Sequence, residues 1–332
     1  MSRERILVTG ASGFLGSAVT EALSNQGYIV RQAVRRSRPG MTGEIALVPD
    51  LLDREAVRAA LLGMDGVVHL AAHVHDMAPT AESIREFHRI NVDGTQLLLE
   101  EAKAANLRKF VFFSSVKAVG EANTAPWSED VVPQPRDQYG ESKLAAESLV
   151  LAIGLRATVL RLPLAYGPRM KGNMLRLFDA VARGIPLPFR NVQNKRSLVF
   201  SHNVGEAVRC SLQSDNAGGE VFFVSDGYDL STTELIGEIG AALGKRPRLY
   251  TLNPSLLTAA GKIGDRLGRP GRPFLVNSDI LQRLFGSLTV DDSRLRRLTG
   301  YSPKVSLKEG LRVTAKWYLD RESSPTARSA NY

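Results

Sequence analysis

The sequence contains little cysteine and no long apolar run, and both absences exclude classes of protein. Cys210 is the single cysteine among 332 residues, so no internal disulfide framework can form, as is usual in a reducing compartment. No run of about 20 apolar residues could span a bilayer. The first residues, MSRERILVTG, pass directly from charged side chains into an apolar run, without the cleavage site of a signal peptide. We therefore expect a cytoplasmic protein that binds no membrane.

Basic residues exceed acidic ones, but they are not gathered in one stretch. The chain has 43 Lys and Arg against 34 Asp and Glu, a formal net charge of +9. Such a charge can indicate nucleic-acid binding, yet RNVQNKR, GKRPR, GRPGRP and RLRRL are short and scattered, as on a solvated surface. We expect no nucleic-acid partner. His73 and His75 have no third ligand at a plausible spacing, so we expect no metal and place both at the mouth of a cavity.

Short β-branched or aromatic runs alternate with amphipathic segments as far as about residue 165. The runs are RILVTG, YIVRQAV, IALVP, GVVHLAA, KFVFFSS and ATVLRLPL. This alternation predicts right-handed βαβ units and a parallel sheet. The expected fold is therefore α/β, a Rossmann-like doubly wound parallel sheet, followed by a smaller interleaved part where Pro and Gly become frequent. Such sheets bind ligands outside the carboxyl ends of their strands.

A glycine-rich turn follows the first run. Gly10, Gly13 and Gly16 lie between RILVTG and the helix-like SAVTEAL. Glycines there permit a tight turn and a close approach of the backbone to a pyrophosphate, and the helix N-terminus offers free N–H groups to the anion. The order strand, turn, helix predicts a dinucleotide site. Its three-and-three spacing differs from G-x-G-x-x-G and resembles the TGxxGxxG of the short-chain dehydrogenase/reductase family.

That resemblance implies a Tyr-x-x-x-Lys pair on a helix and a hydroxyl residue at an upstream strand end. Tyr139 and Lys143 have the spacing that places both side chains on one helix face. KFVFFSS ends in two serines, and alignment of SSVKAVG on the family's SSxxVYG selects Ser115, with Ser114 as a close rival. A neighbouring ammonium and a nicotinamide cation favour a phenolate, so Tyr139 can exchange a proton with an alcohol or carbonyl. Ser115 would polarise the carbonyl oxygen.

The resemblance also implies a set of cofactor contacts. Asn91, in NVDGT, resembles a supporting active-site residue, and a helix N-cap is the alternative role. Tyr139 and Lys143 are expected to contact the cofactor as well. The remaining expected contacts are Gly10, Ser12, Gly13, Phe14, Leu15 and Gly16 in the turn, Asp50 and Leu51 at the adenine, Leu70, Ala71 and Ala72 after the fourth strand, and Pro163.

Later segments point to one branch of the family. GNML, GIPLPF, NKRSLVFSHNV, FFVSDGYDLST and YSPKVSLKEGL resemble extended members, bacterial UDP-sugar 4-epimerases and 4-reductases used for surface polysaccharide. In that branch Asn173 and Arg196 correspond to residues that hold the nucleotide diphosphate, Arg283 is a further candidate, and Ser115 also contacts substrate. Leu164 replaces the usual Asn of LRPxNVYGP, so this chain departs from the family at one substrate contact.

The change of pattern after residue 165 and the polar, aperiodic end predict a division of the chain, and the resemblance implies a homodimer formed through the Tyr/Lys helix. Residues 1–165 are expected to form the NAD(P)-binding domain, with strands returning from about 196–225. Residues 166–320 would be mainly the substrate-binding part, and residues 321–332 a disordered tail.

The second strand ends without the usual carboxylate. Counting from the glycine turn, the ribose-binding Asp would fall near Val34, and Arg35 and Arg36 follow it. An arginine there can pair with a 2′-phosphate, so NADP(H) is favoured over NAD(H). NADPH mostly serves net reductions, which favours a reductase of a UDP-4-keto-6-deoxy-(N-acetyl)hexosamine. The alternatives are a UDP-hexose 4-epimerase, a reductase of a non-sugar ketone, and a non-catalytic NADP-sensing module.

Overall fold

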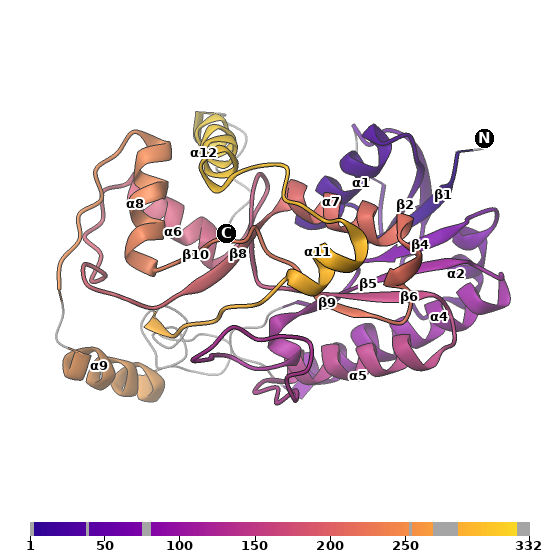
Figure 1. Cartoon of the computed structure of the whole chain (residues 1–332), viewed down its shortest axis with the longest axis horizontal. Helices are drawn as coiled ribbons and strands as arrows, with labels where there is room; N and C mark the ends of the chain where they lie inside the picture. The colour runs from indigo at the N-terminus through magenta and orange to yellow at the C-terminus, as the bar shows by residue number, and fades with distance from the viewer. Residues whose placement is uncertain (1–2, 38–39, 75–80, 252–253, 268–284, 324–332) are drawn as a thin grey trace.

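A seven-stranded parallel sheet forms the larger part of the molecule (Figure 1). The computed structural model describes residues 3–37, 40–74, 81–251, 254–267 and 285–323. The strand order is β3-β2-β1-β4-β5-β6-β9, which confirms the predicted Rossmann-like sheet. In chain order the strands are β1 (Arg5–Thr9), β2 (Ile29–Val34), β3 (Glu44–Leu47), β4 (Gly66–His69), β5 (Lys109–Ser115), β6 (Ala157–Leu162) and β9 (Val221–Phe223).

Helices cover both faces of this sheet, which is why its central strands are apolar on both sides. In β1, Ile6 and Val8 face the core under α1 (Phe14–Asn25) and α7 (Ser201–Gln213), as the alternation of a strand requires. Leu7 faces the second core, under α2 (Arg54–Leu61), α4 (Gly94–Ala104) and α5 (Gln138–Ala152). Figure 1 shows these two helix layers above and below the sheet.

Local signals set where several helices begin. The side chain of Asp53 accepts a hydrogen bond from the Ala56 N–H and caps α2, and Asp137 caps α5 in the same way through the Gly140 N–H. Ser231 and Glu234 form a capping box at the start of α8 (Thr232–Leu243). Before α4, α3 (Ala81–His88) passes through one π-helical turn, η1 (Arg89–Asp93). Such turns often lie at functional sites.

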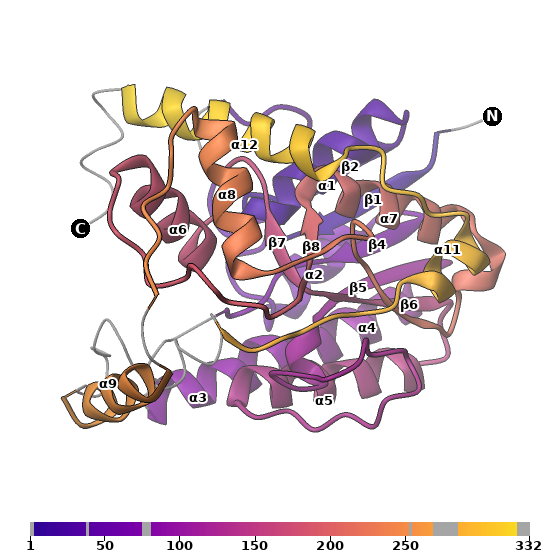
Figure 2. The same cartoon turned by 60° about the vertical axis from the view of Figure 1, so that its left-hand side comes forward.

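A second, smaller part contains a mixed sheet of order β10-β8-β7, with β10 and β8 labelled in Figure 1 and β8 and β7 in Figure 2. Its strands are β7 (Leu164–Tyr166), β8 (Arg196–Phe200) and β10 (Asp229–Leu230). Phe178 of α6 (Gly172–Ala182), Ile236 of α8 and Tyr318 of α12 (Leu307–Ser323) meet in its core. The other elements are α9 (Pro254–Leu267), α11 (Ser293–Thr299), η2 (Val116–Ala118) and η3 (Asp215–Ala217).

The boundaries differ from the expected ones in two places. The return to the large sheet, expected from about residue 196, starts later, because β8 pairs with β7 and β10, whereas α7 packs on the large sheet and β9 pairs with β6. Helix α12 continues to Ser323, so residues 321–323 are helical, and residues 324–332 lie outside the described residues. In the described ranges no helix is long and apolar enough to cross a membrane.

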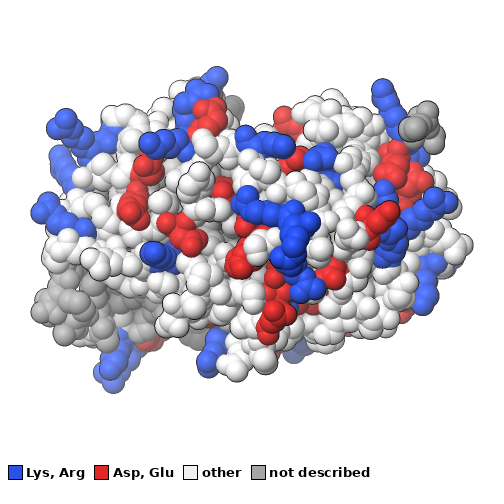
Figure 3. All heavy atoms as spheres, in the orientation of Figure 1, with Lys and Arg blue, Asp and Glu red and all other residues white. Residues whose placement is uncertain are grey.

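Charged side chains of both signs are mixed on the face drawn in Figure 3. Blue arginines over α11 stand beside red carboxylates there, and two of the helix's arginines are paired: Arg294 with Glu220 and Arg296 with Asp292. The basic run RLRRL therefore carries fewer free charges than its sequence implies.

Candidate active site

The glycine turn after β1 depends on the absence of side chains at two positions. Gly10 has a φ of +68°, and a Cβ built on it would lie 2.8 Å from the backbone N of Ala71. A Cβ on Gly16 would lie 2.1 Å from the carbonyl oxygen of Gly10. The Gly13 N–H donates to that same carbonyl at 2.9 Å, and Gly13 is the N-cap of α1. This tight turn leaves the start of α1 open to an anionic ligand. Ser12, Phe14 and Leu15 beside it are partly buried.

A buried histidine at the end of β4 links the strand before this turn to α4. His69 at the end of β4 is fully buried, with Nδ1 2.6 Å from Thr9 Oγ1 and Nε2 3.0 Å from Thr95 Oγ1. Burial, followed by the charge of Lys143, lowers the pKa of His69 to about 3, so the ring is neutral. Thr9 Oγ1 also accepts from the Ala71 N–H at 3.2 Å. Leu70, Ala71 and Ala72, all partly buried, are thereby held beside the glycine turn.

Helix α5 brings Tyr139 and Lys143 to the carboxyl end of β5. The side chains of Tyr139 and Ser115 are hydrogen-bonded. Burial raises the pKa of Tyr139 to about 12, while the bond with Ser115 lowers it and Asp137 raises it. Lys143 is 2% exposed, and its Nζ lies 4.1 Å from the centroid of the Phe112 ring. Burial lowers the pKa of Lys143 to about 7, although Glu147 opposes this.

The two candidate serines have different surroundings. Ser115 is the N-cap of η2, where its Oγ accepts from the Lys117 N–H at 3.2 Å, and it also bonds with Tyr139. Ser114 is buried, and its Oγ donates to Glu147 at 2.5 Å. Both partners belong to α5, but Ser114 bonds with Glu147, two helical turns beyond Tyr139, and of the two serines Ser115 is the one that bonds with the phenol.

Asn91 lies inside the π-helical turn and is not a helix N-cap. Its Oδ1 accepts from the His73 N–H at 2.7 Å, and its Nδ2 donates to the His73 carbonyl at 3.1 Å and to Ser142 Oγ at 2.9 Å. Asn91 therefore joins the loop after β4 to α5. The His73 ring packs on Phe87 at 4.9 Å between centroids, and Phe87 packs on Tyr139 at 6.1 Å. His75 lies outside the described residues.

The part of the site that is expected to hold the adenosine contains both acidic and basic side chains. Asp50 pairs with Arg89 and accepts from the Leu52 N–H at 3.0 Å, and the backbone bond and the arginine lower its pKa. Leu51 beside it is partly buried. Arg35 and Arg36 are exposed directly after β2, whereas Val34 is 3% exposed.

The expected substrate residues lie in or next to the smaller part. Asn173 is exposed in the first turn of α6. Arg196 is the first residue of β8, partly buried, and its Nη1 donates to the Gly286 carbonyl at 3.2 Å. Pro163 is buried between β6 and β7. Arg283 lies outside the described residues. The described residues contain no group of three His, Cys, Asp or Glu that could hold a metal ion.

Known proteins are similar to this chain in sequence and in fold over almost their whole length. The chain is 33% identical to a UDP-glucose 4-epimerase of Vibrio cholerae, over 95% of each chain. It is 27% identical to the N-acetyl-alpha-D-glucosaminyl-diphospho-ditrans,octacis-undecaprenol 4-epimerase of Escherichia coli O157:H7, again over 95% of each. A UDP-glucuronic acid 4-epimerase from Bacillus cereus, solved in complex with UDP-glucuronic acid and NAD, superposes with a TM-score of 0.75 at 25% identity, covering 95% of this chain and 99% of that one.

A family model agrees with these relatives. Residues 6–225 match the NAD dependent epimerase/dehydratase family, from β1 to just after β9. The matched range includes the glycine turn and the Tyr139, Lys143 and Ser115 group, so the resemblance found in the sequence is confirmed. The chain is an enzyme of the NAD dependent epimerase/dehydratase family, within the extended short-chain dehydrogenases/reductases.

Proposed function

We propose that the protein is a 4-epimerase of a diphosphate-linked hexose, with a UDP-sugar as its substrate. The observation that carries the proposal is the hydrogen bond between Ser115 and Tyr139, with Lys143 buried one helical turn away. These groups suit removal and return of a proton at a sugar hydroxyl. The relatives reported above are named 4-epimerases. They support the epimerase, which the sequence analysis ranked second, over the net 4-ketoreduction that it ranked first.

The residues fit a dinucleotide, because a Cβ at Gly10 or Gly16 would close the turn on which a pyrophosphate would lie. When bound, the nicotinamide supplies the acceptor and donor of the hydrogen at C4. Tyr139 would take the proton of the 4-hydroxyl and later return it to the same oxygen, while the opposite configuration at C4 comes from return of the hydrogen to the other face of that carbon. Lys143 stabilises the phenolate by its charge, and Ser115 donates a hydrogen bond to the oxygen on C4. Ser12, Phe14, Leu15, Leu70 to Ala72, Asn91 and Pro163 would line the cofactor.

Arg35 and Arg36 support a preference for NADP within a family named for NAD. Both are exposed at the end of β2, beside β1 and its glycine turn, and neither pairs with another described residue. Val34 offers no carboxylate to a ribose. A 2′-phosphate would meet two free guanidinium groups there. Asp50 and Leu51 would contact the adenine.

Asn173 and Arg196 are proposed to hold the diphosphate of the substrate, and Arg283 is carried as a further candidate. Arginine can meet two phosphate oxygens at once. We assign residues 1–165, together with α7 and β9, to cofactor binding and most of 166–320 to substrate binding.

We also propose a homodimer formed through α5, on which Leu151 is 42% exposed. Sedimentation velocity tests it, and a monomer at working concentration would exclude it.

The test supplies the purified protein with UDP-glucose, UDP-N-acetylglucosamine or a UDP-4-keto-6-deoxyhexosamine, with NAD or NADP in both redox states. We expect conversion of a UDP-hexose to its C4 epimer without net consumption of reduced cofactor. One reduced cofactor used for each product formed would establish the reductase instead.

The double variant Arg35→Ala/Arg36→Ala tests the cofactor preference. It should weaken NADP binding by about 10- to 100-fold and leave NAD binding unchanged. An equal loss for both cofactors would contradict the phosphate role.

A further inference from the structure

Helix α5 carries a second buried charged residue on the face that holds the reactive pair. Tyr139, Lys143 and Glu147 follow one another at intervals of four, so their side chains lie on one side of the helix. Glu147 is 2% exposed, as is Lys143. The proposed chemistry uses the first two residues and leaves the carboxylate without a role.

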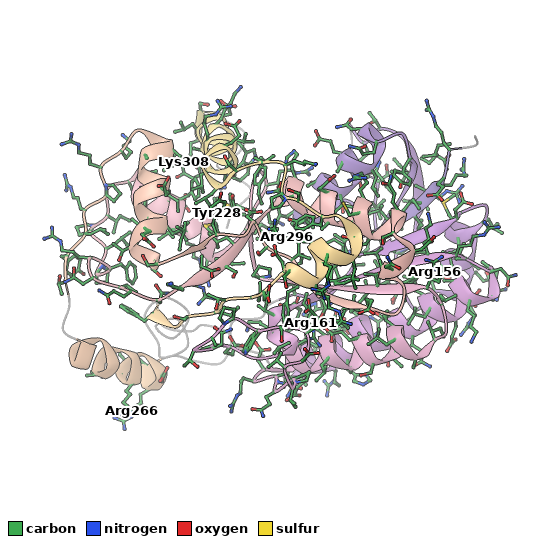
Figure 4. The ribbon with its side chains drawn as sticks, in the orientation of Figure 1. Arg156, Arg161, Tyr228, Arg266, Arg296 and Lys308 are labelled. Carbon is green, nitrogen blue, oxygen red and sulfur yellow. The ribbon has the colours of Figure 1, made fainter. Side chains whose placement is uncertain are left out.

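The Glu147 carboxylate holds two neighbouring strands at once. Its Oε1 accepts from Ser114 Oγ at 2.5 Å and from Arg161 Nε at 3.0 Å, and its Oε2 accepts from Arg161 Nη2 at 2.7 Å. Ser114 and Arg161 are directly paired across β5 and β6. Arg161, labelled in Figure 4, extends from β6 and is 5% exposed. The helix is thus fastened at the position where β5 ends in Ser115.

A buried ion pair of this kind is a costly way to join a helix to a sheet. Removing charges from water commonly costs more than their attraction returns, and apolar side chains of similar volume often serve stability as well. Here one guanidinium nitrogen, Arg161 Nη1, remains buried without a hydrogen-bond partner. Stability alone therefore does not explain the pair, and its place beside Lys143 points to function.

We propose that Glu147 is a positioning residue of this site. It fixes the position of α5 along the ends of β5 and β6, next to Ser115, and it supplies the buried negative charge that keeps Lys143 protonated. The inference rests on the proposed function only for the use made of Lys143. The charge itself is a property of the folded chain.

The groups around Lys143 identify Glu147 as its counter-charge. Phe112 on β5 faces the ammonium with a ring, and His69 on β4 is neutral. From α5, Tyr139 is protonated, because burial raises its pKa to about 12. Glu147 is the group whose charge raises the pKa of Lys143 against the effect of burial. Loss of this carboxylate would remove the one group among the described residues whose charge raises the pKa of Lys143.

The experiment measures the pKa of Lys143 directly, by NMR titration of protein with isotope-labelled lysine side-chain carbons. The Lys143 signal is assigned as the one that is missing from the spectrum of Lys143→Met. Glu147→Gln keeps the size and a hydrogen-bonding group but removes the charge. We expect the pKa of Lys143 to fall by about one unit or more and kcat for epimerisation to fall by about 10- to 100-fold, with its alkaline limb moved to lower pH. An unchanged pKa of Lys143 would overturn the proposal.

The matched control is Glu141→Gln, which removes the same charge from the exposed face of the same helix. It should leave the pKa of Lys143 unchanged, and a shift as large as that of Glu147→Gln would contradict a specific role. If Glu147→Gln does not fold, Glu147→Asp retains the charge and shortens the side chain. It should lower kcat while the pKa stays within about half a unit, and a fall of a full unit would contradict the electrostatic role. Because titration needs no substrate, an inactive wild-type enzyme would refute the proposed function without deciding this inference.

Discussion

Burial shifts the pKa values of Tyr139 and Lys143, two residues of the site, in opposite directions. Burial raises the pKa of Tyr139 to about 12 and lowers that of Lys143 to about 7. Both shifts oppose ionisation, since burial penalises the charged form of either group. In the proposed mechanism, the added positive charge of an oxidised nicotinamide would favour the phenolate.

Tyr139→Phe tests the proton transfer. The variant keeps the ring that packs near Phe87 and loses only the hydroxyl, so we expect turnover to fall by about 10²- to 10⁴-fold and cofactor affinity to remain close to that of the wild type. Steady-state kinetics and calorimetric titration of the cofactor measure the two effects. Tyr228→Phe, at a tyrosine that is 61% exposed, is the control. Near-normal turnover in Tyr139→Phe would remove this residue from the proposed mechanism.

Lys143→Met separates stability from activity. The folded state lowers the pKa of Lys143 from 10.5 to about 7, so between these values the unfolded chain binds more protons and stability rises with pH. Below about pH 7 Lys143 is charged in both the folded and the unfolded state, so the full free-energy cost of burying its charge remains. We expect the variant to be inactive and more stable than the wild type at pH 7 by about 1–3 kcal/mol, with the difference shrinking as the pH approaches 10. Denaturant unfolding at several pH values measures this, and a difference that grows with pH would contradict the assignment.

At the scale of elements, the turn between β1 and α1 is the least tolerant of added atoms. Gly16→Ala would place a methyl group 2.1 Å from the Gly10 carbonyl oxygen, so the backbone must move. We expect a loss of about 1–3 kcal/mol in the free energy of unfolding and loss of dinucleotide binding.

Gly237→Ala is the matched control, because a Cβ on this residue of α8 has no atom within 4 Å. Replacing an exposed helical glycine should increase stability by about 0.5–1 kcal/mol. Thermal unfolding and cofactor titration of both variants provide the comparison. Normal dinucleotide affinity in Gly16→Ala would show that the turn does not hold the pyrophosphate.

At the scale of the whole molecule, a buried polar network joins the two sheets. Asn203 of α7 donates to Asp226 Oδ1 and to the Val305 carbonyl, both at 2.8 Å, and accepts from the Lys304 and Val305 N–H groups at 3.0 Å. Asp226 also accepts from Tyr166 of β7 and from the Phe200 N–H of β8. The large sheet, the small sheet and the segment before α12 are thus fastened at one point.

Asn203→Ala would remove four hydrogen bonds: the buried Asp226 keeps its bonds from Tyr166 and Phe200, whereas the part-buried backbone groups of Lys304 and Val305 lose this partner. Each uncompensated buried group costs about 1–3 kcal/mol, so we expect a loss of about 2–4 kcal/mol in the free energy of unfolding. Asn216→Ala, at an exposed asparagine of η3, should change it by less than about 0.5 kcal/mol. Urea unfolding measures both, and equal stability of the two variants would show that the network does not hold the parts together.

The sequence by itself determined the alternation of strands and helices, the glycine turn and the Tyr139 to Lys143 spacing, because these depend on local periodicity and on steric needs within a few residues. It also identified the family. Tertiary structure alone decided what depends on contacts between distant segments. It directed Ser115 to Tyr139 and Ser114 to Glu147, placed β8 in the small sheet, and buried His69 between Thr9 and Thr95. Ser114 and Ser115 are neighbours of identical type that differ in the distant residues each one contacts, and no local pattern contains that information.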